Sequence, residues 1–338
     1  MQKYKIKLKQ FLKFILPLKL RLKLRNIYDD INANIKRHQA INFIPTLIPL
    51  ESLNVPRYIV SLTSYGKRLT VTAPFAIATL LNQTVKPDKI ILWVAHEDKK
   101  NIPHIMEKLI EKGLEIRFCE DIRSYTKLIP AIENFPNDYI ITADDDLFYP
   151  QNWFCQLMSG HKSNQRKIIC HRAHGIKVDE NHDPISYMDW DFCIEPNGYF
   201  KHIFPAQDKS VSCHQRESIF PTGVGGILYP PKCLHKDTTD KELFMKFAPR
   251  ADDIWFWAMA VIHKDYFGDE SPYIVIGNGY SQKLLLVDPR EERCGNTLLR
   301  SNWSENGNDK QLKAVIEQYP QIRDILRKIC THKSCNEL

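Results

Sequence analysis

Short apolar runs alternate with helical patterns along the middle of the chain. Four runs of apolar and β-branched residues have the length and composition of buried strands: residues 58–63, 89–94, 114–118 and 139–143. Between them, three segments are predicted to be helices: residues 73–82, 103–112 and 127–133. Strands that alternate with helices form βαβ units, so the pattern predicts an α/β fold with a parallel sheet. Ligands of such sheets bind beyond the carboxyl ends of the strands.

Other segments extend this pattern on both sides. Residues 167–170 are predicted to be a strand, and the segment Phe220-Pro-Thr-Gly-Val-Gly-Gly-Ile-Leu-Tyr-Pro-Pro231 places three glycines before another short strand. No Gly-Lys-Ser/Thr sequence occurs there, which excludes a nucleoside-triphosphatase loop. There are two interpretations of these glycines: they allow a substrate to approach the backbone closely, or they form an ordinary β-bulge. Residues 26–56 contain three prolines in their second half and are predicted to be a linker.

Composition narrows the class of protein. The 338 residues are 43% hydrophobic and 26% charged, with 13 Gly, which is a globular composition and excludes collagen, a coiled coil and wholesale disorder. No uninterrupted apolar run is long enough to span a membrane. The nine cysteines include no C-x-x-C pair, so we expect reduced thiols and a cytoplasmic protein. Cys330, His332 and Cys335 are a weak candidate metal cluster.

The positive charge is concentrated at the N-terminus. Of the 47 Lys and Arg residues, nine lie in residues 1–25, which contain no acidic residue, so the remaining 38 face 40 Asp and Glu. A near-neutral body argues against a nucleic-acid partner. Residues 1–25 interleave Lys and Arg with Leu, Ile and Phe, which is typical either of a segment that binds an anionic membrane surface or of a solvated basic extension.

Two acidic groups are candidates for chemistry. Asp144, Asp145 and Asp146 directly follow a predicted strand, where alternate carboxylates can point the same way and bind Mg²⁺ or Mn²⁺ with substrate phosphates. The alternative is an exposed acidic turn. Asp252 and Asp253 precede a mostly apolar helix, and we expect one of them to cap it. The helix dipole would lower the pKa of the other and keep it ionised, as a general base requires.

This ordered set of motifs resembles a GT-A glycosyltransferase, most closely the family 2-like enzymes of bacterial surface polysaccharide and lipooligosaccharide assembly. It comprises the strand ending in Thr63-Ser64-Tyr65, the segment 121–127, the triplet Asp144-Asp145-Asp146 and the pair Asp252-Asp253. The resemblance covers residues 57–290. It implies a Rossmann-like nucleotide-binding half with a mixed central sheet and helices on both faces, a nucleotide-sugar donor, with a UDP-sugar favoured, and a divalent metal. Residues 1–56 are then a basic extension, and residues 291–338 a C-terminal extension or lid.

The resemblance also implies roles for individual residues. Asp146 corresponds to the metal ligand. Asp144 either shares the metal or contacts the donor, and Asp145 is implied as a further donor contact. Asp253 corresponds to the catalytic base, although Asp252 stands where the family usually has Glu, so the choice between the two stays open. His263 is a weak candidate for a further metal ligand. The donor contacts implied by position are Thr63, Tyr65, Arg68, Asp121 and Lys127.

The function that follows is metal-dependent sugar transfer, with inversion, to a hydroxyl of a glycan or lipid-linked acceptor. Trp255, Trp257 or Tyr229 would exclude water from the acceptor. His171 and His174 are expected to be structural or to add a cationic group. The basic N-terminus then predicts a peripheral protein on the inner face of the cytoplasmic membrane. The alternatives are a nucleotidyltransferase, or an inactive scaffold at the membrane.

Overall fold

The computed structural model describes residues 18–42, 56–194, 219–268, 270–276, 285–290 and 307–331. Within these ranges, a central sheet has the strand order β10-β6-β9-β4-β1-β2-β3. Its strands are β1 (Tyr58–Thr63), β2 (Lys89–Ala95), β3 (Leu114–Cys119), β4 (Tyr139–Thr142), β6 (Ile168–Cys170), β9 (Ile227–Tyr229) and β10 (Tyr273–Val275). All neighbours are parallel except β9, which pairs antiparallel with both β4 and β6. The sheet is therefore mixed, as the resemblance implied.

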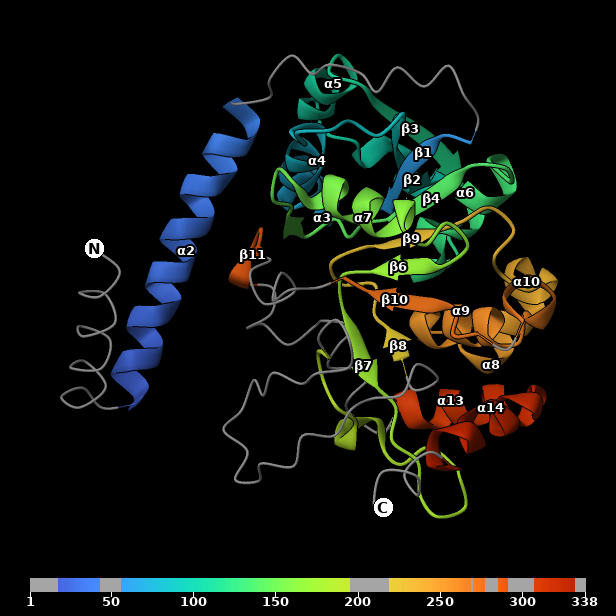
Figure 1. Cartoon of the computed structure of the whole chain (residues 1–338). Coiled ribbons are helices and arrows are strands. Elements are labelled where there is room, and N and C mark those ends of the chain that lie inside the picture. Colours follow the sequence, from blue (N-terminus) through green and yellow to red (C-terminus); the bar gives the residue numbers. More distant parts are fainter. Residues whose placement is uncertain are drawn as a thin grey trace.

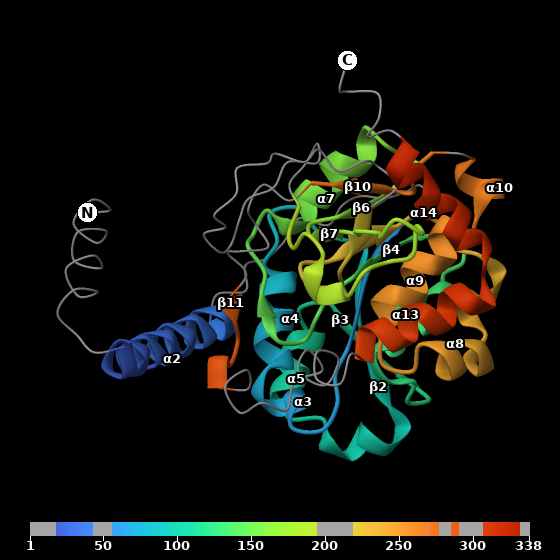
Figure 2. The ribbon, with the colours of Figure 1, turned by 90° about the horizontal axis from the view of Figure 1, so that it is seen from below.

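Helices cover both faces of the sheet (Figures 1 and 2). One face carries α3 (Arg68–Val71), α4 (Ala73–Leu81), α5 (Ile105–Ile110) and α7 (Trp153–Lys162). The other carries α6 (Ile129–Asn134), α8 (Lys241–Phe247), α9 (Asp252–Val261), α10 (Lys264–Phe267), α13 (Gly307–Gln318) and α14 (Gln321–Thr331). A hydrophobic core lies on each face of the sheet. Each strand contributes side chains to both cores, because successive side chains point to opposite faces. In β1, Ile59 packs in the core beneath α9, and Val60 and Leu62 pack in the core beneath α4.

Smaller elements complete the described part of the chain. Two short antiparallel pairs lie outside the central sheet: β5 (Leu147–Phe148) with β11 (Leu285–Leu286), and β7 (Ala173–Gly175) with β8 (Ile219–Pro221). Short 3₁₀ helices lie at η1 (His96–Asn101), η2 (Arg123–Lys127), η3 (Tyr187–Asp189) and η6 (Lys236–Thr239). The four strands predicted first from the sequence correspond to β1 to β4, and the predicted helix at residues 73–82 is α4. These predictions are confirmed.

The prediction of a linker over residues 26–56 is wrong for its first part. A helix, α2 (Leu18–Asn42), extends through residues 26–42, directly after Pro17. The prolines that suggested a linker all lie beyond its end. In Figure 1, α2 lies along one side of the molecule, and its contacts with the body are mainly with α4. No helix of the described residues is long and apolar enough to cross a membrane.

Candidate functional site

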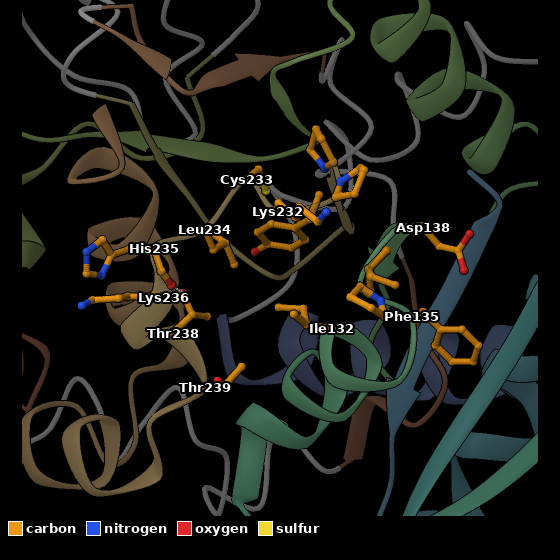
Figure 3. A pocket seen from close by; sticks show the side chains of 15 residues that line it. Ile132, Phe135, Asp138, Lys232, Cys233, Leu234, His235, Lys236, Thr238 and Thr239 are labelled. Atoms are coloured by element: carbon orange, nitrogen blue, oxygen red, sulfur yellow. Dashed lines mark hydrogen bonds between the residues drawn. The ribbon is translucent and has the colours of Figure 1, made fainter. Parts of the chain in front are cut away.

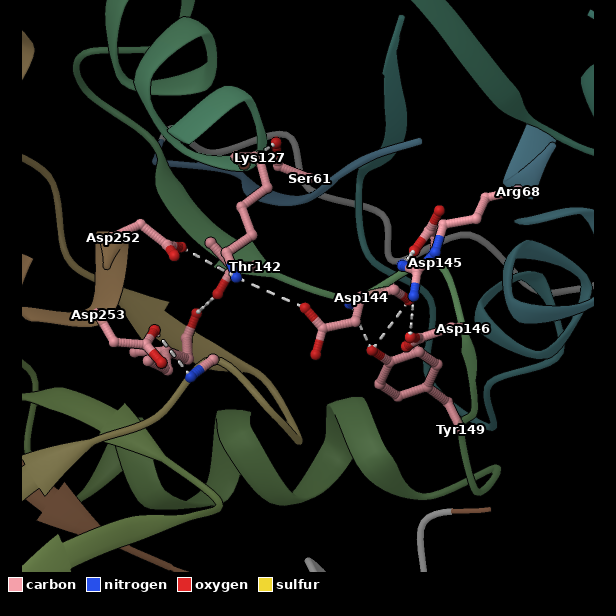
Figure 4. A network of polar contacts seen from close by, with 12 residues as sticks. Ser61, Arg68, Lys127, Thr142, Asp144, Asp145, Asp146, Tyr149, Asp252 and Asp253 are labelled. Carbon is pink, nitrogen blue, oxygen red and sulfur yellow. Dashed lines mark hydrogen bonds and ion pairs between the residues drawn. The ribbon is translucent and has the colours of Figure 1, made fainter. Parts of the chain in front are cut away.

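The two acidic groups lie at the same edge of the sheet. Strands β1 and β4 are adjacent and parallel, so the segment after Thr63 and the triplet after Thr142 leave the sheet side by side. Beyond β4, the acidic triplet occupies a tight connection to β5. The N-terminus of α9 brings Asp252 and Asp253 to the same place from the other layer (Figure 4). This is the edge at which α/β sheets bind their ligands.

An arginine from α3 holds two of the three triplet carboxylates. The guanidinium of Arg68 donates to Asp145 Oδ1 at 2.6 Å and to Asp146 Oδ2 at 2.8 Å. The hydroxyl of Ser64 donates to the other Asp145 oxygen at 2.6 Å. Burial raises the pKa of Asp145 and raises that of Asp146 to about 7, although Arg68 acts in the opposite direction on both. Asp145 is thus a buried support, whereas Asp146 keeps part of its side chain exposed.

Lys127 joins the triplet to the acidic pair. Its ammonium lies 3.5 Å from Asp144 Oδ1 and 3.2 Å from Asp252 Oδ2. Burial alone would lower the pKa of Lys127, but the carboxylates of Asp252 and Asp144 raise it well above the usual value for lysine. The ammonium is therefore fixed in its charged form. Gly223 makes room for it, because a Cβ at that position would lie 2.7 Å from the lysine nitrogen.

The triplet does not present Asp144 and Asp146 in one direction. Asp144 extends toward Lys127, and Asp146 lies beside Arg68 (Figure 4). The Tyr149 hydroxyl accepts a hydrogen bond from the Asp144 backbone N–H at 2.6 Å and donates one to the Asp144 carbonyl at 3.2 Å. Tyr149 therefore fixes the backbone from which the first carboxylate of the triplet projects.

Neither carboxylate of the acidic pair caps α9. The helix begins at Asp252, its N-cap is Ala251, and no side chain caps it, so the prediction of a capping Asp is wrong. Asp253 Oδ1 instead accepts a hydrogen bond from the backbone N–H of Gly223 at 3.0 Å. Burial and the nearby Asp252 charge raise the pKa of Asp253 to about 7, against the pull of Lys127. The expected lowering by the helix dipole is overcome, because burial penalises the ionised form more strongly.

The triplet has partial capacity for a divalent cation. Among the described residues, no group of three or more His, Cys, Asp or Glu side chains could hold a metal. The described hydrogen bonds of Asp144 and Asp146 involve only one oxygen of each carboxylate. Because the two side chains point apart in this structure, each offers one oxygen separately to Mg²⁺ or Mn²⁺, which commonly bind proteins through one or two carboxylates and complete their shell with water and substrate phosphates.

The other predicted donor contacts are more dispersed. The Thr63 hydroxyl donates to the Trp93 carbonyl at 3.0 Å. Tyr65 is exposed, and the Arg68 guanidinium lies 5.9 Å from the centre of its ring. Asp121 is exposed beyond β3 and accepts from the backbone N–H of Arg123 at 2.7 Å. Arg68 and Lys127 thus contact the acidic cluster directly, whereas no described contact links Asp121 to it.

The predicted histidine and aromatic residues lie away from the acidic cluster or within the core. His263 follows the far end of α9, about 15 Å of helix from the acidic pair at 1.5 Å per residue. His171 and His174 are buried; desolvation lowers the pKa of His171 to about 4 and that of His174 well below its usual value. Both are therefore neutral structural residues. Trp255, Trp257 and Tyr229 are also buried, so they do not border an open acceptor surface.

A separate cavity of about 180 Å³ opens at the opposite edge of the sheet, beyond the start of β4 and the end of β9 (Figure 3). Its lining is mostly apolar. The one carboxylate in the lining, Asp138, is held by Arg57 at 2.7 Å. This cavity therefore lacks both the free carboxylates and the position expected of the donor site.

Sequence reasoning missed three positioning groups. Ser64 stands out in the sequence only as part of the first-strand motif, no local pattern singles out Tyr149, and the Gly223 amide has no side chain to identify it. The polar cluster Thr63-Ser64-Tyr65 after a buried strand was a usable signal for Ser64. The hydrogen bonds of Tyr149 and Gly223 reach across the fold and have no counterpart in local spacing.

Residues 71–222 match the family model described as glycosyl transferase family 2. This match, a little under half of the chain, includes the triplet but ends before Asp252 and Asp253. With the mixed sheet and its two helical layers, it supports a GT-A, family 2-like fold and a glycosyltransferase. A search of curated protein sequences gave no significant match.

Several solved structures are similar to this chain. A 4-diphosphocytidyl-2C-methyl-D-erythritol synthase from Anaerococcus prevotii has 14% identity and a TM-score of 0.39, over 72% of this chain and 96% of that one. Mannosyltransferase PcManGT from Pyrobaculum calidifontis, in complex with GDP-Man and Mn²⁺, has 11% identity and a TM-score of 0.28, over 48% and 47%. S. aureus TarS has 12% identity and a TM-score of 0.38, over 66% and 35%. This chain therefore spans about half or less of the last two proteins, and likeness at these TM-scores carries no weight for activity.

Proposed function

We propose that this protein transfers a sugar from a nucleotide-sugar donor, with a UDP-sugar favoured, to a hydroxyl of a glycan or lipid-linked acceptor. The observation that carries the proposal is the single polar network at the ligand-binding edge of the sheet. Lys127 connects the Asp144 end of the triplet to the Asp252 end of the acidic pair, at 3.5 and 3.2 Å. One half of this network suits a donor diphosphate, and the other half suits an acceptor hydroxyl.

Asp146 and Asp144 would hold Mn²⁺ or Mg²⁺ at the donor half. When bound, the cation supplies positive charge that stabilises the departing nucleoside diphosphate. Arg68 keeps the Asp146 carboxylate in place, and Ser64 does the same for Asp145. Thr63, Tyr65 and Asp121 are proposed as contacts to the nucleotide, at the same edge of the sheet.

Asp253 is proposed as the general base. As the acceptor oxygen forms a bond to the anomeric carbon, the bond from that carbon to the donor phosphate breaks and its electron pair leaves with the diphosphate. The acceptor proton passes to Asp253. The pKa of about 7 supports this role, because a base whose pKa lies near the working pH is ionised in a useful fraction and still binds a proton. Attack from the face opposite the leaving group inverts the anomeric configuration.

The proposed setting is cell-surface polysaccharide or lipooligosaccharide assembly at the inner face of the cytoplasmic membrane. Support comes from the charge of residues 1–25, where nine Lys and Arg residues have no acidic neighbour. A lipid-linked acceptor would be presented at such a surface. Residues 1–17 lie outside the described residues, as do residues 291–306 and 332–338 of the proposed C-terminal extension or lid at 291–338, which include His332 and Cys335 of the weak metal cluster.

Thermal unfolding with UDP, GDP, CMP and ADP, each with and without Mn²⁺, tests the donor site. A ligand at a hundredfold its Kd stabilises by about 2.7 kcal/mol. We expect a Mn²⁺-dependent rise in Tm with one nucleotide, lost in Asp146→Asn and kept in Asp265→Asn, an exposed carboxylate on α10. No rise with any nucleotide would contradict the proposal and favour an inactive scaffold.

Transfer itself tests the base. Asp253→Asn should keep the nucleotide-dependent rise in Tm and lose sugar transfer by roughly 10²- to 10⁴-fold, the range for loss of a general base. The released product is measured in the same assay, and inorganic pyrophosphate in place of a nucleoside diphosphate would identify a nucleotidyltransferase. If Asp253→Asn transferred sugar at the wild-type rate, the base assignment would be wrong.

A further inference from the structure

One face of α2 exposes a continuous apolar stripe. At 3.6 residues per turn, positions spaced by three or four residues lie on one side of a helix. The exposed side chains with this spacing are Leu20 (42% exposed), Leu24 (46%), Ile27 (47%), Ile31 (54%) and Ile35 (52%), which we name the α2 stripe. Tyr28 extends it to one side and is 64% exposed. A single exposed apolar side chain is ordinary. Five such side chains aligned along about four turns of one helix face indicate a surface that binds a partner.

The stripe points away from the protein. The residues of α2 that the body buries are Ala33 and Ala40, and they lie on the opposite side of the helix from the stripe. Arg37 also faces the body, where its guanidinium lies 3.8 Å from Asp288 and 5.9 Å from the centre of the Phe75 ring. The body therefore contacts α2 through Ala33, Ala40, Arg37 and the partly buried Ile41, whereas the large apolar side chains of the α2 stripe are left outside.

The charges of α2 select the partner. The helix contains six basic residues, Lys19, Arg21, Lys23, Arg25, Lys36 and Arg37, against two acidic residues, Asp29 and Asp30. A second copy of the chain would bring the same positive helix against this one, which opposes pairing. An anionic lipid surface instead attracts Lys and Arg while the acyl region accepts the Leu and Ile side chains. We infer that α2 lies in the plane of an anionic membrane surface, with the α2 stripe inserted among the lipids.

This placement orients the candidate site. The ammonium of Lys36 lies 5.8 Å from the centre of the Phe148 ring in β5, the strand that directly follows the acidic triplet. Next to Asp288, which faces Arg37, the backbone N–H of Val287 donates to the Asp146 carbonyl at 2.8 Å. The membrane-facing helix therefore contacts β5, which follows Asp146, and the segment around Asp288, which is hydrogen-bonded to the Asp146 backbone. A protein bound through the stripe holds the triplet near the lipid surface, where a lipid-linked acceptor lies.

The inference extends the membrane contact of the proposed function from residues 1–25 to an oriented surface that reaches Ile35. It rests on α2 alone and not on sugar transfer. Either can therefore fail separately: nucleotide-dependent stabilisation tests the donor site, and vesicle binding tests the stripe. Asp146→Asn should lose the first and keep the second.

Co-sedimentation of the full chain with vesicles of phosphatidylglycerol and phosphatidylcholine tests the inference. Ile31→Glu places a charge in the stripe, and Leu22→Glu places the same charge on an exposed leucine on the other side of α2. We expect wild type to bind these vesicles and not pure phosphatidylcholine. Ile31→Glu should weaken vesicle binding roughly tenfold or more, since the apolar contact is lost. The loss of binding caused by Leu22→Glu should be several times smaller than that caused by Ile31→Glu.

Two controls complete the design. Circular dichroism should show equal Tm values for wild type and both variants, because residues 22 and 31 are exposed. Size-exclusion chromatography with light scattering should give the same mass for all three. Equal vesicle binding by Ile31→Glu and Leu22→Glu would overturn the inference, as would a wild-type dimer that only Ile31→Glu dissociates, because the stripe would then be a contact between copies.

Discussion

At the residue scale, the candidate site places five carboxylates, from the triplet and the acidic pair, close to two cations. Arg68 offsets the charges of Asp145 and Asp146, and Lys127 offsets those of Asp144 and Asp252. These groups are largely withdrawn from water, where a charge without a partner is costly. Removal of either cation therefore affects the folded state itself as well as any ligand that it binds.

Lys127→Met should lower the free energy of unfolding by roughly 3 kcal/mol, the cost of leaving one member of a buried ion pair without its partner. Urea denaturation near pH 8 measures the change. The matched control is Lys89→Met, because Lys89 pairs with Glu115 at 2.9 Å but both side chains are about one third exposed. That variant should lose about 1 kcal/mol or less. Equal losses in the two variants would show that the Lys127 bridge is not a buried interaction.

Asp253 predicts a pH dependence of stability. Its folded pKa of about 7, raised by burial and by Asp252, lies above the ordinary value of 3.8. A raised carboxyl pKa means that the folded protein holds the proton more tightly than the unfolded chain, so this group's contribution to stability is complete below pH 4 and is lost as the pH rises through 7. Asp253→Asn cannot ionise. It should stabilise the protein at pH 8 by on the order of 1–2 kcal/mol.

The same substitution should stabilise the protein less at pH 5 than at pH 8, because at pH 5 only part of the interval between the unfolded pKa of 3.8 and the folded pKa of about 7 has been crossed. Urea denaturation of wild type and Asp253→Asn at both pH values measures the difference. A stability gain that is the same at pH 5 and pH 8 would refute the raised pKa. The exposed variant Asp265→Asn controls for the general loss of a negative charge.

At the element scale, the junction of β4 and β9 depends on a glycine. Gly226 has a φ of +94°, and a Cβ there would lie 2.6 Å from the Trp153 ring and 3.0 Å from the Thr142 carbonyl. Neither neighbour can move easily, because Thr142 O is backbone in β4 and the Trp153 indole donates to the Gly225 carbonyl at 2.6 Å. Gly226 therefore allows β9 to pair with the strand that carries the triplet.

Gly226→Ala should destabilise the protein by about 3 kcal/mol, from the overlap together with the positive φ. The control is Gly66→Ala, where φ is +50° and no atom lies within 4 Å of the added Cβ. It should cost about 1 kcal/mol from the backbone conformation alone. Urea denaturation of both variants measures the two effects, and a smaller loss in Gly226→Ala than in Gly66→Ala would contradict the packing argument.

The elements differ in how far their sequence determines them. Strands β1, β2 and β4 were predictable because each is a mostly apolar and buried run, whereas β3 alternates apolar with charged residues. Helix α2 was not predicted over residues 26–42, because the prolines beyond Asn42 suggested a linker for a stretch that itself contains no proline. The three-residue strands β7 and β8 are too short for any periodic signal, and their pairing is set by the surrounding fold. The acidic residues of the site could be found from their position after predicted elements. Their pairing with the cations could not, because Arg68 and Asp145 are 77 positions apart.

At the scale of the whole molecule, charge is divided between a basic N-terminal region and a near-neutral body. The net charge is +7, yet the 38 Lys and Arg residues after residue 25 face 40 Asp and Glu. Within the site, Arg68 pairs with Asp145 and Lys127 pairs with Asp144. Two kinds of binding should therefore respond differently to ionic strength, one through exposed charges at the surface and one through groups that the fold encloses.

Exposed charges are screened over a Debye length that falls from about 10 Å at 0.1 M salt to about 3 Å at 1 M. Vesicle binding through the basic residues of α2 should therefore fall steeply over this range, toward the residual contribution of the α2 stripe. The nucleotide-dependent rise in Tm should change far less, because Lys127 and Asp253 are shielded from solvent ions. Co-sedimentation and thermal unfolding on the same protein, at both salt concentrations, measure the two responses. If vesicle binding were insensitive to salt while the nucleotide response disappeared, the basic N-terminal region would not be the membrane contact, and the donor would be held by exposed charges outside this enclosed network.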